Sequence, residues 1–257
     1  MTESIARPLR GGVPLNPRTA LSDLIARVFS APFAKVFSSP IASPGAVAAI
    51  PWYLSGGIAA ANCIAAYQPK GAASLAASYA NLPNPGTYNA VPLDAITVLN
   101  AYGWYWNDYN IVICSLKAGI DASTMITVVV RYKTWENVFA LFGAQSSAGN
   151  IFGIGMHGQG YIGNSYPTFT PTPVGTDNCM IICRTNRRLY YNGLKIQSSG
   201  NAETSWGSFG IRGCPNYNDD TNGYPWRPGG GVAAWVAFNT DITDDQAAAL
   251  YTNIMIL

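Results

Sequence analysis

The stretch Arg188-Leu-Tyr-Tyr-Asn-Gly-Leu-Lys-Ile196 constrains the fold of this chain more than any other part of it. Two short runs, rich in aromatic and branched residues, flank the dipeptide Asn192-Gly193. Asn-Gly readily takes the two positive-φ positions of a type I′ turn, whose twist matches that of the strands it joins. The stretch therefore predicts a tight antiparallel β-hairpin.

Short apolar, β-branched and aromatic runs recur along most of the chain, with turn residues between them. Residues 125–132 are mostly β-branched, which predicts a central strand buried on both faces. Many short strands, with helix expected only near each end, predict an all-β fold built as a two-sheet antiparallel sandwich. The other expected strands are residues 63–67, 103–107, 111–114, 138–142, 151–155, 180–184, 208–212 and 232–238.

The first 57 residues form an arm that is rich in proline, alanine and serine. Asn16-Pro17 favours a helix start, because asparagine caps a helix and proline suits its first turn. The arm is too short and too often broken by proline to form its own core. Its apolar stripe is therefore expected to serve assembly by docking on another copy or another protein, in preference to its own sandwich or a lipid surface. At helical spacing the stripe contains Leu21, Leu24, Ile25, Val28 and Phe29.

The pattern Thr243-Asp-Asp-Gln246 is typical of a capping box, in which two side chains satisfy the free N–H groups at a helix start. It predicts a short helix that runs to about residue 251. Taken together, these features divide the chain into a docking arm, residues 1–57, and a β-sandwich, residues 58–257.

Charged residues make up only 11% of the chain, and the net charge is +2. Without a run of Lys or Arg, we expect no nucleic-acid partner. No apolar stretch reaches about 18 residues and no signal-peptide pattern opens the chain, so we expect neither a membrane span nor export by that route. The low charge fits a surface buried among copies, or an ordinary β protein rich in Gly, Ser, Thr and Asn.

The five cysteines are odd in number and lack the paired short spacings of a zinc site. Cys179 and Cys183 lie four residues apart in an apolar run, and hence on one face of a strand. This pattern predicts buried free thiols in a chain that folds in a reducing compartment.

Several of these segments together resemble the laminin-G-like domains, also called concanavalin-A-like β-sandwiches. Tyr190-Tyr-Asn-Gly193 is similar to a hairpin of that family. The resemblance covers residues 60–257 and implies a jelly-roll β-sandwich, a fold that serves lectins, glycan hydrolases, adhesion proteins and viral structural proteins alike. Residues 65–74 and 79–86 also resemble chains common in bacteriophage and environmental viral genomes. The family's C-terminal ending is matched by Ile242, Thr243, Asp245, Gln246, Leu250 and Tyr251, with Ile242 in place of the usual leucine.

The chain carries no catalytic signature. Glycoside hydrolases of the resembled fold carry a Glu-x-Asp-x-Glu strand, whereas Glu3, Glu136 and Glu203 are isolated and the core strands are expected to lack carboxylates. His157 is the only histidine, which argues against a serine-hydrolase relay and a multi-histidine metal site. Residues 153–160 contain Gly-x-Gly-x-x-Gly, but no helix is expected to follow and hold a phosphate. We therefore predict a protein that is not an enzyme and needs no cofactor.

One loop, residues 214–231, combines adjacent carboxylates, aromatic rings and an arginine, the mixture that a sugar site uses for stacking and polar orientation. Its side-chain oxygens also suit Ca²⁺, although the order of an EF-hand is missing. The alternative is that Tyr224 and Trp226 pack the loop onto the sheet. The candidate ligand-binding residues are Asp219, Asp220, Tyr224, Trp226 and Arg227.

The favoured function is a structural or receptor-binding component of a bacteriophage particle, as a capsid decoration, fibre or tail-associated protein. The resembled fold usually works outside cells, and release by cell lysis would explain the missing secretion signal. The expected location is therefore the virion, after synthesis in the host cytoplasm. Expected partners are other copies of the chain, other virion proteins and host-surface glycan. The alternative is a carbohydrate-binding module or lectin, and the less favoured one a divergent glycoside hydrolase.

Overall fold

The computed structural model describes residues 49–92, 97–106, 116–134, 140–145, 151–155, 160–163, 175–197, 208–211, 213–215, 223–225 and 230–257. Apart from Ala49, all these residues belong to one structural unit, Ile50–Leu257. The predicted assembly stripe, Leu21, Leu24, Ile25, Val28 and Phe29, lies outside the described residues. Its docking role therefore stays a prediction.

The larger sheet has eight strands among the described residues, and every pairing in it is antiparallel. β6 lies between β10 and β16, and its residues Val128, Val129 and Val130 are fully buried. The predicted central strand is therefore confirmed, although it begins two residues later than expected. The strand order is β12 (Leu194–Gln197), β11 (Arg188–Tyr191), β10 (Asp177–Cys183), β6 (Thr127–Thr134), β16 (Gly230–Phe238), β4 (Gly103–Trp106) and β3 (Val98–Asn100), while β1 (Cys63–Tyr67) also pairs with β16.

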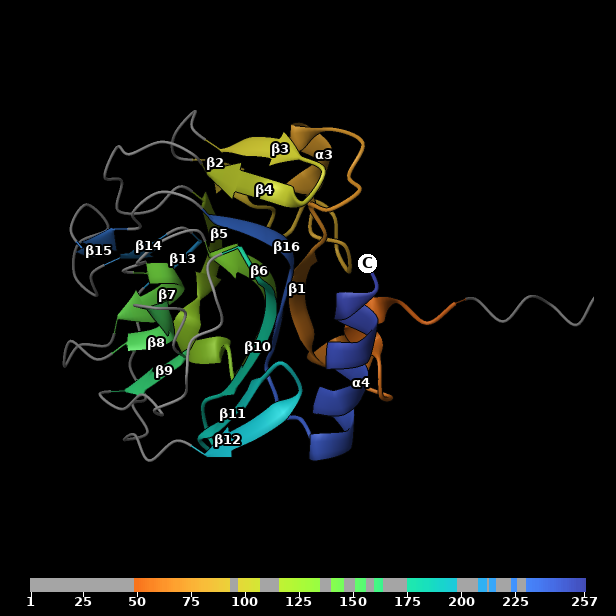
Figure 1. The fold of residues 1–257 in the computed structure, drawn as a ribbon, viewed down its shortest axis with the longest axis vertical. Coiled ribbons are helices and arrows are strands. Elements are labelled where there is room, and N and C mark those ends of the chain that lie inside the picture. Colours follow the sequence, from red (N-terminus) through yellow and green to blue (C-terminus); the bar gives the residue numbers. More distant parts are fainter. Residues whose placement is uncertain are drawn as a thin grey trace, which may run out of the picture. The chain divides into compact units, whose positions relative to one another are not determined.

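A second antiparallel sheet lies across the core from the first (Figure 1). A short two-stranded ladder, β14 (Gly213–Pro215) and β15 (Gly223–Pro225), lies next to it, with β14 against β7. The order of strands in the second sheet is β2 (Val91–Pro92), β5 (Leu116–Asp121), β13 (Ser208–Ile211), β7 (Ala140–Gln145), β8 (Ile151–Gly155) and β9 (Gly160–Gly163).

The core between the sheets is built from alternate residues of their strands, because successive side chains of a strand point to opposite faces. Val128 and Val130 of β6 face Leu116 and Ile120 of β5 within one buried cluster. Aromatic rings fill its other end, where Tyr67 stacks on Trp235 and packs beside Trp104. The predicted all-β, antiparallel, two-sheet sandwich is confirmed, and Trp104 is a fully buried core residue.

Helices cover the opposite face of the larger sheet. In Figure 1 the C-terminal helix α4 (Asp244–Met255) lies against that face, on the side away from the second sheet. It buries Ala247, Leu250 and Ile254 in a second cluster with strand residues such as Val129 and Ile181. Among the described residues no helix is long and apolar enough to cross a membrane. The short helices are η1 (Trp52–Leu54), η2 (Ala60–Asn62), α3 (Leu75–Ser78) and η3 (Ala122–Thr124).

The predicted capping box at the start of α4 is confirmed. The backbone N–H of Gln246 donates to Thr243 Oγ1 at 3.2 Å, and the N–H of Thr243 donates to Gln246 Oε1 at 2.9 Å. The helix continues to Met255, beyond the predicted end near residue 251, since Ile254 follows Leu250 by four residues and extends the buried stripe.

The strands that the sequence analysis missed are mostly two to four residues long and lie at sheet edges or in the separate ladder: β2, β3, β9, β14 and β15. β5 is longer and buries Leu116, Ala118 and Ile120 alternately, but Gly119, at φ 65, weakens its strand propensity. The predicted strand 111–114 lies outside the described residues. Cys179 and Cys183 are buried free thiols on one face of β10, as predicted, and burial raises the pKa of Cys183 to about 11.

Candidate functional site

The predicted ligand loop is only partly described. Asp219, Asp220, Trp226 and Arg227 lie outside the described residues, and Tyr224 is placed by its backbone alone, paired with Cys214 across the β14–β15 ladder. The two aspartates therefore belong to the connection of a hairpin, and Trp226 and Arg227 follow its second strand. Among the described residues no cluster of His, Cys, Asp and Glu could hold a metal ion. Sugar and Ca²⁺ binding by this loop stay predictions.

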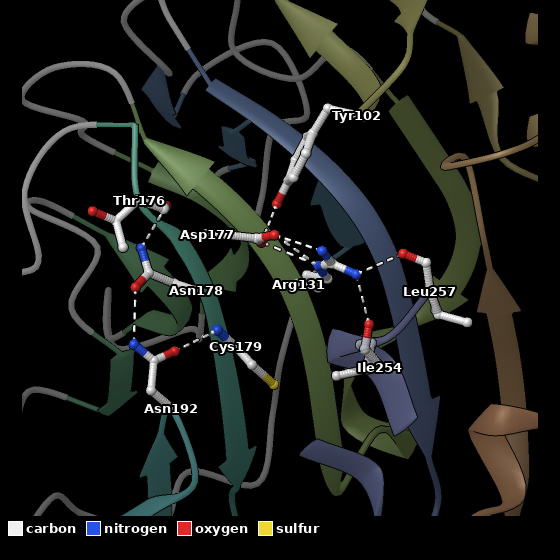
Figure 2. A network of polar contacts seen from close by, with 9 residues as sticks. All are labelled: Tyr102, Arg131, Thr176, Asp177, Asn178, Cys179, Asn192, Ile254 and Leu257. Atoms are coloured by element: carbon white, nitrogen blue, oxygen red, sulfur yellow. Dashed lines mark hydrogen bonds and ion pairs between the residues drawn. The ribbon is translucent and has the colours of Figure 1, made fainter. Parts of the chain in front are cut away.

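A buried ion pair joins two strands of the larger sheet on the face that α4 covers (Figure 2). Arg131 of β6 directs Nε and Nη2 at the carboxylate of Asp177 in β10, with Nη2 and Oδ2 2.5 Å apart. The hydroxyl of Tyr102 donates to Asp177 Oδ1 at 2.8 Å. Arg131 Nη1 donates to the carbonyls of Ile254 and Leu257, each at 3.0 Å. The pair thus ties the C-terminal end of α4 to the sheet.

The charges of this cluster are suited to holding α4 on the larger sheet. Burial alone would raise the pKa of Asp177, but hydrogen bonds from Arg131 and Tyr102 outweigh that effect and hold the pKa below its ordinary value. Burial and the nearby carboxylate raise the pKa of Tyr102, so its hydroxyl keeps its proton and is a poor nucleophile. The guanidinium of Arg131 already bonds a carboxylate and two carbonyls. These groups therefore hold the fold together.

This ion pair corrects the expectation that the core strands carry no carboxylate, because Asp177 opens β10 opposite Lys133 of β6. The available signal was Arg131, a charged residue within the otherwise apolar run Val128-Val-Val-Arg-Tyr132. A charge in a strand that is buried on both faces requires a partner of opposite charge nearby. The sequence alone could not say which aspartate supplies it.

The predicted hairpin turn is confirmed, with Asn192 at φ 47 and Gly193 at φ 79. The side chain of Asn192 also continues the ladder: its Oδ1 accepts from the backbone N–H of Cys179 at 2.8 Å. Its Nδ2 donates to Asn178 Oδ1 at 3.0 Å (Figure 2). The same oxygen also accepts from the Tyr191 hydroxyl at 2.9 Å. Asparagine is therefore required here for its amide as well as for its left-handed backbone.

The hairpin turn also contacts the helix. A Cβ atom at Gly193 would lie 2.9 Å from Cδ1 of Tyr251 in α4. The two segments that carry the family resemblance, the Asn-Gly hairpin and the Leu-Tyr ending, are thus packed against each other. Their contact explains why both patterns occur in one chain.

Asp244, the first residue of α4, connects the same hairpin to the start of the helix. Its carboxylate accepts from Lys195 Nζ at 2.7 Å, from the Tyr190 hydroxyl at 2.6 Å and from Arg188 Nη1 at 2.9 Å. The bonds from Lys195 and Tyr190 contribute most to lowering the pKa of Asp244 to about 2. Hairpin and helix are therefore joined at both ends of their contact.

A loop over residues 79–90 closes the outer edge of β1. Asn81 is fully buried, and its Oδ1 accepts from the backbone N–H of Ala66 at 2.9 Å. Its Nδ2 donates to the carbonyls of Ile64 and Thr87, and the N–H of Leu82 donates to Ala66 O. The side-chain amide of Asn81 thus replaces a neighbouring strand. In the sequence, part of this stretch, residues 79–86, is marked only by its resemblance to viral chains.

No protein-family model and no curated protein sequence matches the chain. Solved structures do match. A mutant of Trypanosoma rangeli sialidase displaying trans-sialidase activity matches with a TM-score of 0.55 and 13% identity, over 76% of this chain and 34% of the sialidase. Trypanosoma rangeli sialidase in complex with 2,3-difluorosialic acid matches with a TM-score of 0.53 and 14% identity, over 80% of this chain and 35% of the sialidase. Domain 4 of AbnA, a GH43 extracellular arabinanase from Geobacillus stearothermophilus in complex with arabinotriose, matches with a TM-score of 0.42 and 13% identity, over 74% of this chain and 98% of the domain.

The fold of this chain is therefore one that also occurs in sialidases, and the chain spans about a third of the length of the sialidases that it matches. This finding corrects the prediction of a protein that is not an enzyme, because the structures that share the fold are enzymes. That prediction rested on the absence of a Glu-x-Asp-x-Glu strand. Sialidases, however, use a tyrosine nucleophile and depart from the usual carboxylate pair. None of the matches reported above supports the virion prediction.

Proposed function

We propose that this chain is a carbohydrate-binding β-sandwich of the glycoside-hydrolase-like fold, with its glycan site in the loop 214–231. The observation that carries the proposal is the fold that the chain shares with Trypanosoma rangeli sialidase, whose structures hold sialic acid and its 2,3-difluoro derivative. On this proposal the two-sheet sandwich is a jelly roll of the concanavalin-A-like kind, in agreement with the laminin-G-like resemblance of residues 60–257.

The distribution of buried surface supports a site on loops. The larger sheet is covered on one face by the second sheet and on the other by α4. Its charged side chains have partners within the chain: Arg131 bonds Asp177, Arg188 and Lys195 bond Asp244, and Lys133 lies over the ring of Tyr102. This sheet therefore offers few free polar groups, which favours the connections between strands as the source of directed hydrogen bonds to a sugar. The loop 214–231 supplies aromatic, acidic and basic side chains in one connection, next to the second sheet.

The test is a glycan array that carries sialylated, neutral and arabinose-containing glycans, followed by titration calorimetry on the best ligand. We expect the wild-type chain to bind, and Trp226→Ala to weaken binding by about 1 kcal/mol or more at an unchanged melting temperature. Trp104→Ala is the matched control, because Trp104 is fully buried and its loss must lower the melting temperature instead. An array without signal would contradict the proposal. Sugar released from a bound glycan would make the same site catalytic.

The expected virion location and virion partners remain predictions of their own. They require that the chain co-purify with particles through a density gradient. A chain that stays in the soluble fraction of a producing culture would contradict them and would leave the glycan proposal unaffected.

A further inference from the structure

The loop 79–90 holds an exposed tyrosine on a strained backbone. Tyr88 has φ 56, in the left-handed region that residues other than glycine and asparagine seldom occupy. Strain of this kind persists only where the surrounding contacts over-determine the conformation, and it gathers at sites of function.

Contacts on both sides of Tyr88 enforce this conformation. Its carbonyl accepts a hydrogen bond from the hydroxyl of Tyr67, a fully buried core residue that stacks on Trp235 with ring centroids 5.4 Å apart. The next residue, Asn89, uses Oδ1 to accept from the backbone N–H groups of Asn81 and Gly86, each at 3.0 Å. The backbone on either side of the tyrosine is therefore fastened to the core and to the loop interior.

While its backbone is fastened, the Tyr88 side chain remains accessible, with 43% of the residue exposed. The described residues offer its hydroxyl no hydrogen-bond partner. Leu82 and Val91 are also large apolar residues that remain 40% and 55% exposed. Between them in the sequence are the exposed polar residues Asn84 and Thr87, and residues 79–92 include no charged side chain. The exposed side chains of this loop are thus aromatic, apolar or neutral and hydrogen-bonding.

We propose that Tyr88 is a preformed stacking platform for an uncharged sugar ring, and hence a second glycan contact in addition to the loop 214–231. This inference rests on the proposed carbohydrate-binding function. A sugar ring presents C–H groups on its face and hydroxyls on its rim, which fits an aromatic ring flanked by amide and hydroxyl groups. Residues 79–92 contribute no cation of their own, although Lys117 pairs with Val91 in the neighbouring strand, and the aromatic face of Tyr88 favours the C–H face of a neutral sugar as the ligand.

Because the backbone at Tyr88 is already fixed, this platform should bind a ligand with higher affinity than a flexible loop would. A tyrosine has few rotatable bonds, and a loop already fixed in its binding conformation loses little further entropy when a ligand arrives. The strain at Tyr88 is the cost in stability of placing a ring, instead of glycine, at this point of the turn.

The test uses two glycine variants that relieve the same strain at different places. Arg187 has φ 55, nearly that of Tyr88, in the turn between β10 and β11. Because glycine adopts a positive φ freely, Tyr88→Gly and Arg187→Gly should both keep or raise the melting temperature. The neutral glycan that the wild type binds best on the array is then titrated into the wild type, the two glycine variants and Tyr88→Phe. We expect Tyr88→Gly to weaken binding about tenfold or more, Tyr88→Phe to retain it, and Arg187→Gly to leave it within about twofold.

Each result decides between the proposals. Unchanged affinity of Tyr88→Gly for a glycan that the wild type binds would overturn the stacking platform and leave the proposed function standing. A wild-type chain that binds no glycan on the array would overturn both. If Tyr88→Gly does not fold, hydroxyl-radical footprinting of the wild type replaces it, and a bound neutral glycan must then protect Tyr88 from oxidation. Equal oxidation with and without glycan would overturn the proposal.

Discussion

At the scale of single residues, side chains with two roles hold this protein together. Arg131, itself buried, compensates the partly buried charge of Asp177 and also bonds the carbonyl of Ile254 in the last turn of α4, where a cation is stabilised by the negative end of the helix dipole. Asn192 takes the left-handed turn position and uses its amide as a strand neighbour. Replacing such a residue removes two interactions at once.

Gly193 gives the clearest prediction at this scale. Gly193→Ala should destabilise the sandwich for two reasons, the positive φ of 79 and a Cβ atom 2.9 Å from Tyr251. Gly71→Ala is the matched control, because Gly71 has φ 78 and open space around its Cβ position. We expect the two variants to differ in unfolding free energy by about 1 kcal/mol or more, as overpacking costs. The measurement is urea denaturation. Equal losses of unfolding free energy at the two positions would show that the Tyr251 ring moves aside without destabilising the fold.

At the scale of elements, the hairpin β11–β12 and the helix α4 form one structural pair. The turn packs on Tyr251, while three hairpin side chains bond the carboxylate of Asp244 at the helix start. Sequence patterns predicted both elements, since a type I′ turn and a capping box depend on neighbouring residues. Their contact joins residues 49 or more positions apart, and nothing local in the sequence indicates it.

The charge on Asp244 makes this pairing depend on pH. Its pKa is lowered in the folded chain to about 2, from an ordinary value of 3.8, so its contribution to stability is present above about pH 4 and is lost as pH falls toward 2. Asp244→Asn should therefore lower the melting temperature at pH 7 and have little effect at pH 2. Asp245→Asn is the control, since Asp245 lies in the same helical turn without these three bonds. Similar pH profiles for the two variants would contradict the role of the hairpin.

At the scale of the whole molecule, hydrophobic periodicity predicted the two-sheet sandwich because its longest strands are buried on both faces. The candidate site was harder to predict. Tyr88 lies in a proline-rich loop, and its strain follows from the bond of Tyr67 to its carbonyl and the bonds of Asn89 to Asn81 and Gly86, which only the folded chain creates. The edge strands were missed because two or three residues carry no periodicity.

The N-terminal arm provides a prediction at the same scale. Trp52 and Tyr53 pack against the cluster beneath α4, and a Cβ atom at Gly56 would lie 2.9 Å from the Cα of Gln246. Deletion of residues 1–49 should therefore leave the melting temperature nearly unchanged, whereas deletion of residues 1–57 should cost on the order of 2 kcal/mol of stability through lost burial. Light scattering tests the assembly role. If the chain without residues 1–49 self-associates like the full chain, the predicted docking stripe is wrong.

The position of α4 in the chain also bears on how the protein is made. This helix follows every described strand in the sequence, yet it covers the outer face of β6, β10 and β16. A ribosome releases the strands first, so that face stays bare until the helix emerges. We expect the nascent chain to remain a client of molecular chaperones up to that moment, and its folding to be completed only after α4 has been synthesised.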